Sequence, residues 1–340
     1  MNKRLSAIAV SVIGLLLIVV ALTQNLFAVG PAFEDLIEDF RPALTDESIA
    51  TLRSDLGMLG GAVDEFQTGL APALATQLNV DPATFSALMA EQFPDVITGI
   101  AVVPEAGPTF TGIIDLLDEQ QGNFASADAI PTTSLPATTV PWGIVLVGLI
   151  FVGVGGYLLT AQTRRSAIVA TIAGVLVVAG VFGLSLTGKS ADADALNEAL
   201  KPVYTEETVV GAAQAVAAIE AMGAEMQTAM LPGLGGMLGM TESEVQSFLG
   251  AQFPALATAL GEMPEALQRF DGVVTTFDQN LANYATLRPV AFAPIIWTVI
   301  AGALLVLVAC GATLRSYRNE IEPGASSEAN KQSVGPEEVS

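Results

Sequence analysis

The chain has no histidine, and its only cysteine is Cys310. Histidine is the commonest general base and metal ligand of proteins, and disulfides or CxxC motifs need a second cysteine. These absences argue against histidine-dependent hydrolysis, a zinc site and a disulfide framework. We therefore expect no catalytic, cofactor-binding or metal-binding residues, no cofactor and no enzymatic activity.

Charged residues are also scarce. They make up 14% of the 340 residues, whereas hydrophobic residues make up 51%, and the mean hydropathy is +0.56. This composition is too apolar for an ordinary soluble domain and predicts a membrane protein.

Asp and Glu outnumber Lys and Arg by 35 to 13, which gives a net charge of −22. A surface this acidic repels phosphate backbones, so we expect no nucleic-acid binding.

Four runs lack Asp, Glu, Lys and Arg and are long enough for a transmembrane helix, which needs roughly 20 residues. They cover residues 5–29, 141–160, 167–187 and 291–314. Basic pairs, which concentrate on the cytoplasmic side, flank the runs at alternate ends: Lys3 and Arg4, Arg164 and Arg165, Arg315 and Arg318. This predicts a cytoplasmic N-terminus, a cytoplasmic loop at 161–166 and a disordered cytoplasmic tail at 315–340. Segments 30–140 and 188–290 would then lie outside the cell membrane.

The first run has one alternative interpretation. The basic start Met-Asn-Lys-Arg and the small-residue exit of the run also suit a cleaved signal peptide. Its apolar length of about 25 residues exceeds the roughly 7–15 residues of a signal-peptide core, which favours a retained span. Cleavage would leave the topology of the rest of the chain unchanged.

The two outside segments resemble each other when the chain is shifted against itself by 160 residues. Pro42 recurs as Pro202, and the triplet Gln-Phe-Pro occurs at both 92–94 and 252–254. The same shift of 160 residues aligns the first apolar run with the third. A slightly shorter shift aligns Trp142 with Trp297. We expect a duplicated unit of span, outside domain and span, with both copies in the same orientation.

Each outside segment has helical patterning and little strand character. Helices are expected over 45–70 and 205–230, and over 110–121 and 270–280. Asp81-Pro82 and the capping box from Thr241 to Glu244 predict a further helix start in each copy. The proline of Gln-Phe-Pro should end that helix. The sequence thus predicts an all-α integral membrane protein with four transmembrane helices and two tandem-duplicated extracytoplasmic helical bundles, arranged as a pseudo-dimer.

Residues 183–190, Gly-Leu-Ser-Leu-Thr-Gly-Lys-Ser, match the phosphate-loop pattern GxxxxGK[ST]. A working phosphate loop follows a buried strand and opens a helix, whereas here a membrane span precedes the match and the predicted topology places it outside. We expect no nucleotide binding, and we interpret Lys189 as an interfacial lysine.

Three other patterns have structural explanations. Met222, Met226 and Met230 repeat at a spacing of four residues and suit core packing better than a copper site, because no histidine or cysteine supports them. Carboxylate pairs, Glu34 with Glu38, Asp46 with Glu47 and Asp192 with Asp194, lack the spacing of a calcium loop and indicate solvated surface. Cys310 could carry a lipid, but a packed small residue is the preferred interpretation.

With catalysis, metal binding and nucleotide binding argued against, binding of a partner at the protein surface is the function that remains. The sequence favours a non-enzymatic protein of the cell envelope, a scaffold or accessory subunit that binds a partner through its acidic helical ectodomains. The alternative is a transporter or channel subunit for a lipid or neutral solute, suggested by the parallel repeat and the glycine-rich second span. An extracytoplasmic sensor is less favoured because the tail contains no output module. The expected partners are membrane lipids and either an extracytoplasmic or membrane protein or further copies of the chain.

Overall fold

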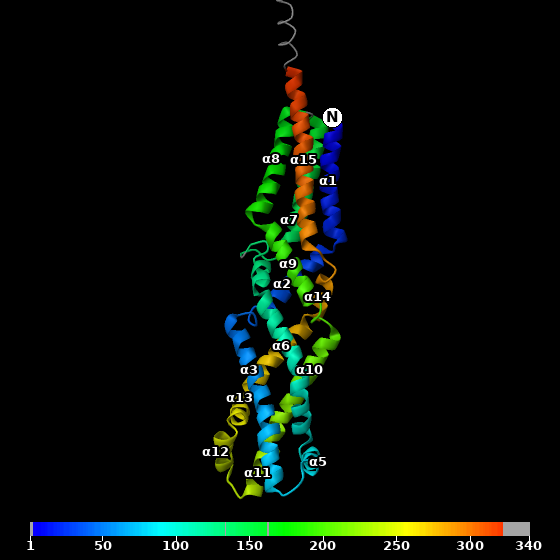
Figure 1. Ribbon diagram of the computed structural model, residues 1–340. Helices are drawn as coiled ribbons and strands as arrows, with labels where there is room; N and C mark the ends of the chain where they lie inside the picture. The colour runs from blue at the N-terminus through cyan, green and yellow to red at the C-terminus, as the bar shows by residue number, and fades with distance from the viewer. Residues whose placement is uncertain (1–2, 133, 162, 322–340) are drawn as a thin grey trace, which may run out of the picture. The chain divides into compact units, whose positions relative to one another are not determined.

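The computed structural model describes residues 3–132, 134–161 and 163–321, and all their regular structure is helical (Figure 1). Within those ranges the one β-type pairing is an isolated bridge between Thr132 and Leu135. The predicted all-α class is therefore confirmed. We expected disorder over 315–340, but α15 continues to Ile321, so that prediction is wrong for residues 315–321; residues 322–340 lie outside the described part.

The helices follow one another with short connections. Their bounds are α1 (Lys3–Thr23), α2 (Leu26–Phe40), α3 (Asp46–Glu65), η1 (Phe66–Leu70), α4 (Ala71–Gln77), α5 (Pro82–Gln92), α6 (Pro94–Asp128), α7 (Thr139–Ala161), α8 (Arg164–Gly183), α9 (Leu186–Leu200), α10 (Glu206–Glu225), η2 (Met226–Met230), α11 (Leu231–Leu238), α12 (Glu242–Gln252), α13 (Pro254–Gln279), α14 (Leu281–Leu287) and α15 (Phe292–Ile321). The two η segments are single turns of π-helix.

The chain forms two compact units, and each is built from segments that are distant in sequence. The first unit comprises the described parts of Met1–Glu34, Ser126–Ala195 and Pro289–Ser340. The second unit comprises Asp35–Ala125 and Leu196–Arg288. The divisions fall inside α2, α6 and α9 and next to α15.

The first unit contains a four-helix bundle of α1, α7, α8 and α15 (Figure 1). Helices α1 and α8 each contact both α7 and α15. Helices α1 and α7 approach especially closely, because a Cβ at Gly148 would lie 2.7 Å from the Gly14 carbonyl oxygen. Most of the exposed large apolar side chains of the described residues lie on these four helices, for example Leu16, Leu149, Leu176 and Val308.

In the described part of the chain, six helical stretches are long and apolar enough to cross a membrane. Four of them, Arg4–Thr23, Thr139–Ala161, Arg164–Gly183 and Leu281–Ser316, overlap the four spans expected from the sequence. The other two, Pro94–Asp128 and Glu206–Met237, have the lowest hydropathy, 1.3 and 1.2. Both belong largely to the second unit.

The second unit packs α3 and α10 against α13. At its centre the rings of Phe110 and Phe270 meet edge to face, with centroids 5.2 Å apart. The buried Asp55 carboxylate accepts two hydrogen bonds from the Arg269 guanidinium, at 2.7 and 2.9 Å. This bidentate pair joins α3 to α13 and compensates the burial of the charge.

Helix bounds in the first part of the chain recur 160 residues later. Helices α2, α3, η1 and α5 begin and end 160 residues before α9, α10, η2 and α12. The residues with positive φ follow the same spacing, since Asn25 and Ser185 precede α2 and α9, and Asn79 and Gly239 follow α4 and α11. The Gln-Phe-Pro prediction is confirmed, because α5 ends at Gln92 and α12 at Gln252.

Two glutamates make reciprocal contacts between these matching parts. Glu65 accepts a hydrogen bond from the Leu256 amide at 2.7 Å, and Glu225 accepts one from the Val96 amide at 2.8 Å. Each carboxylate therefore satisfies an otherwise orphan amide in the first turn of a long helix, α13 for Glu65 and α6 for Glu225.

Helix α6 is longer than expected. It begins at Pro94 and continues through Pro104 and Pro108 to Asp128, whereas the sequence pattern suggested a helix over 110–121 only. A proline inside a helix removes one backbone hydrogen bond. Burial of Ile100 and Val103 before the two prolines and of Phe110 after them holds the helix in the core on both sides. Packing therefore overrides the two prolines.

Candidate functional site

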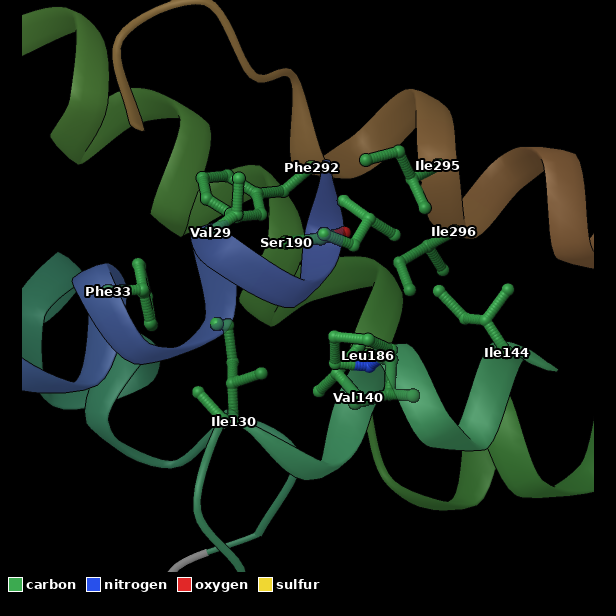
Figure 2. Close-up of a pocket in the computed structure, with 14 residues that line it drawn as sticks. Val29, Phe33, Ile130, Val140, Ile144, Leu186, Ser190, Phe292, Ile295 and Ile296 are labelled. Carbon is green, nitrogen blue, oxygen red and sulfur yellow. The ribbon is translucent and has the colours of Figure 1, made fainter. Parts of the chain in front are cut away.

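The first unit contains an apolar cavity of about 70 Å³ (Figure 2). Its wall comes from α2, the segment before α7, the start of α7, the start of α9 and the start of α15. The lining residues are almost all hydrophobic: Leu26, Val29, Gly30, Phe33, Ile130, Ala137, Val140, Pro141, Ile144, Leu186, Ser190, Phe292, Ile295 and Ile296. The Ser190 hydroxyl donates to the Thr187 carbonyl oxygen at 3.2 Å, so the wall's one polar side chain has an internal partner.

Two local features set this wall. Asn25 and Ser185 adopt left-handed backbone angles, with φ of 51° and 55°, and these angles break α1 from α2 and α8 from α9. Asn tolerates this conformation better than most residues. The breaks make Leu26 and Leu186 the first residues of α2 and α9, and both side chains line the cavity.

Asp194 on α9 fixes the opposite wall. Its carboxylate accepts hydrogen bonds from the backbone amides of Phe292 and Ala293, at 2.6 and 2.9 Å, and so caps α15 from a distant part of the chain. The Phe292 ring then lies 5.3 Å from the Phe33 ring, centroid to centroid. In Figure 2 both rings belong to the cavity wall.

A cation lies beside the cavity. The Lys189 ammonium donates to the carbonyl oxygens of Ala129 and Pro131, at 2.7 and 3.1 Å. These two acceptors flank Ile130, which lines the cavity. In the ranges that the structure describes, no ion pair is formed by Lys189, although the chain as a whole carries a net charge of −22.

The segment that matches the phosphate-loop pattern has a different geometry from such a loop. Helix α8 precedes it, and Gly188, Lys189 and Ser190 lie inside α9. The Lys189 amide donates to the Ser185 carbonyl oxygen at 3.1 Å, and the Lys189 ammonium is bound to carbonyl oxygens. A helix rather than a buried strand leads into this segment, and its lysine is held by backbone carbonyl oxygens, which differs from the arrangement of a phosphate loop.

The second unit has a polar cleft of about 370 Å³ between α10 and α13. Exposed Glu220 and Asp271 lie on its opposite helices, together with Gln227 and Gln268. The positions 160 residues earlier than Glu220 and Asp271 are Gly60 and Thr111, so neither carboxylate recurs at that spacing.

The methionines and the cysteine that were considered as metal ligands or modification sites are buried in the packed interior. Met222, Met226 and Met230 are buried, with exposed fractions of 2% or less. A Cβ at Gly223 would lie 2.5 Å from the Met263 sulfur, so this thioether packs against α10. Among the described residues no group of three or more His, Cys, Asp or Glu side chains could hold a metal ion. Cys310 is buried in α15.

In each of the three carboxylate pairs noted in the sequence, at least one member is described by its own contacts or burial. Asp46 accepts a hydrogen bond from the Gln121 side chain at 3.1 Å, and Asp194 caps α15. One oxygen of Glu34 is buried and has no hydrogen-bond partner among the residues that the structure describes.

An aromatic cluster in the second unit surrounds a buried phenol. The Tyr204 ring stacks on Tyr284 with centroids 4.3 Å apart and contacts Phe40 and Phe277. Burial raises the pKa of Tyr204 well above its ordinary value, and its hydroxyl has no partner among the described residues. Tyr284 donates to the Asn197 carbonyl oxygen at 2.7 Å, and burial raises its pKa to about 12.

Comparison with protein-family models gives no match, and comparison with curated proteins gives none either. The function must therefore be inferred from the residues themselves. The sequence pattern missed the cavity, the contacts of Lys189 and the cap that Asp194 provides. The phosphate-loop match drew attention to Lys189, but only the fold shows which groups the lysine contacts.

Proposed function

We propose that the chain is a multi-pass membrane protein of the cell envelope in which α1, α7, α8 and α15 cross the bilayer. The location of exposed apolar side chains carries this proposal. These four helices expose large apolar residues, whereas α6 exposes none among its described residues. Burial of apolar surface in lipid explains the exposed belt, because a soluble protein rarely leaves so large a patch in water.

The two remaining candidate stretches suit an aqueous location better. Helix α6 carries Asp115, Asp118 and Glu119 near its middle and end, and α10 carries Glu220. Ionised side chains at membrane depth are costly, by about 2.5–3.5 kcal/mol each on insertion scales. In α6, Asp115 and Asp118 also pair with Arg53 at 2.9 and 2.7 Å. We therefore place α6 and α10 outside the membrane.

The flanking charges orient the four spans with both termini in the cytoplasm and place segments 30–140 and 188–290 outside. The shared helix bounds and the reciprocal contacts of Glu65 and Glu225 support a tandem duplication arranged as a pseudo-dimer.

Cysteines introduced as Asp81→Cys and Thr241→Cys should both react with an impermeant maleimide on intact cells. Labelling of either only after lysis would overturn this topology.

The proposed role is that of a non-enzymatic scaffold or accessory subunit that binds a protein partner outside the membrane. The polar cleft supports it, because exposed Glu220 and Asp271 present two carboxylates that basic side chains of a partner could pair with. We propose no catalysis, since the chain has no histidine and its single cysteine is buried.

The test is gentle detergent extraction followed by mass spectrometry of stoichiometric companions and sizing of the complex. The charge reversals Glu220→Lys and Asp271→Lys should release the partner, whereas Glu91→Lys, an exposed acid elsewhere in the second unit, should retain it. A partner that is retained equally by all three variants would contradict the role of the cleft.

A transporter or channel subunit for a lipid or neutral solute is the second candidate function. The observation that favours it is the apolar cavity at the ends of α7 and α15. Recovery of a homo-oligomer without a companion would favour this candidate. Flux of a neutral solute or lipid in liposomes would then be measured.

A further inference from the structure

We propose that the apolar cavity and Lys189 together bind one anionic membrane lipid, with part of an alkyl chain in the cavity and the headgroup at the lysine. This inference rests on the proposed placement of α7 and α15 in the bilayer. It adds a ligand, a binding residue and a headgroup charge to that placement.

The size and chemistry of the cavity suit a section of one alkyl chain. Its volume of about 70 Å³ exceeds the roughly 10–15 Å³ that holds a water molecule and is about half of the ~150 Å³ cavity known to bind benzene. Water needs two or more polar partners in a cavity, and this wall offers one hydroxyl that is already bonded internally. A sterol ring system is too large for this volume, whereas a few methylene groups fit.

The position of the cavity makes a membrane lipid the source of that chain. Pro141 and Ile296 line the cavity, and the next residues, Trp142 and Trp297, are 65% and 55% exposed. Exposed tryptophans on membrane helices concentrate at the level of the lipid headgroups. The cavity therefore lies where a lipid chain leaves its headgroup, and the apolar belt of α7 continues from it along the helix.

Lys189 supplies the preference for an anionic headgroup. An ammonium has three donor hydrogens, and the carbonyl oxygens of Ala129 and Pro131 accept two hydrogen bonds from it. These bonds use two of the three donor hydrogens, and in the part of the chain that the structure describes Lys189 forms no ion pair. Because the two carbonyls flank Ile130, the ammonium is held next to the cavity wall. A phosphate or carboxylate headgroup there would complete the charge balance while its chain entered the cavity.

The test is native mass spectrometry of the purified full chain in detergent, with equal amounts of dioleoylphosphatidylglycerol and dioleoylphosphatidylcholine. The two lipids have identical chains and differ in headgroup charge. We expect the protein to retain one phosphatidylglycerol with at least a tenfold preference. Equal retention of the two lipids would overturn the proposal.

Two variants test the two halves of the site. Lys189→Gln should reduce the headgroup preference to less than twofold, whereas the control Lys201→Gln, whose lysine pairs with Glu198, should keep it. Ile144→Trp fills the cavity and should abolish retention of either lipid, whereas the control Leu146→Trp, on an exposed position of the same helix, should not. If Ile144→Trp elutes as an aggregate, Lys189→Gln still decides the outcome, and an unchanged preference in it would refute the site.

Two further measurements separate this inference from the proposed function. Glycerol phosphate at millimolar concentration carries the headgroup charge without a chain, so displacement of the lipid by it would refute the role of the cavity. If no lipid is retained while the Asp81→Cys and Thr241→Cys variants label from outside, the lipid site is wrong and the topology stands. If the labelling fails, the membrane placement itself is wrong.

Discussion

The close contact between α1 and α7 allows the packing of the four-helix bundle to be tested at two neighbouring glycines. A Cβ built on Gly155 would lie 2.2 Å from the Ser11 hydroxyl oxygen, 2.7 Å from the Ser11 amide nitrogen and 2.9 Å from the Ala7 carbonyl oxygen. A Cβ on Gly156 would meet nothing within 4 Å. The substitutions Gly155→Ala and Gly156→Ala therefore add the same methyl group to the same helix in opposite surroundings.

The expected magnitudes follow from these distances. Two of the three atoms that the new methyl would meet at Gly155 are backbone atoms, so α1 and α7 must separate to admit it. Overpacking of this kind costs about 1–3 kcal/mol, whereas removing an unconstrained helical glycine gains about 0.5–1 kcal/mol. At about 2–4 °C per kcal/mol for a unit of this size, a cost of about 2 kcal/mol lowers the unfolding midpoint by about 4–8 °C.

The assay is size-exclusion chromatography of detergent-solubilised protein after heating for a fixed time, which gives an apparent midpoint. Gly155→Ala should lower this midpoint, and Gly156→Ala should leave it unchanged or raise it slightly. Combining Gly155→Ala with Ser11→Ala removes the hydroxyl but leaves the backbone contacts, so it should rescue only part of the loss. Equal midpoints for the two glycine variants would refute the close packing of α1 and α7.

The remaining predictions concern the second unit. Replacing Glu225 with glutamine removes the charged acceptor of the Val96 amide, so hydrogen exchange at the start of α6 should accelerate while exchange in α12 stays unchanged; uniform acceleration would contradict a local cap. Arg269→Gln leaves the buried Asp55 carboxylate without its bidentate partner and, because Arg269 is itself partly exposed to solvent, should cost about 1–3 kcal/mol in chemical unfolding, and adding Asp55→Asn should recover most of that loss. The Thr84 hydrogen bonds lower the pKa of Asp81, so its contribution to α5 is present above its ordinary pKa and is lost as pH falls through the lowered value. The protection factors of the α5 amides, which correct for the slower intrinsic exchange at low pH, should therefore fall at acidic pH in the native protein, whereas those of an Asp81→Asn variant should not.

Some helix ends could be read directly from the sequence because their hydrogen bonds are local. Asp81 accepts from the amides of Ala83 and Thr84 at 3.1 and 3.0 Å, as its position before proline predicts. Thr241 and Glu244 form the expected capping box. In each case donor and acceptor lie within three residues of each other, so the pattern of residue types is enough to predict the bond.

Other features depend on groups that are far apart in the chain. Asp194 caps α15 across the first unit, and Glu225 caps α6 across the second. No local pattern distinguishes these carboxylates from the many acids on the surface. The continuation of α6 through Pro104 and Pro108 has the same origin, since burial on both sides of the prolines decides it.

The sequence by itself determined the all-α class, the four charge-free apolar runs and the shift of 160 residues that relates the two halves, because each follows from composition and spacing along the chain. Only the tertiary structure revealed the apolar cavity and the carbonyl contacts of Lys189. Both require segments separated by dozens of residues to meet, and packing of the whole first unit, rather than any short stretch of sequence, sets that meeting.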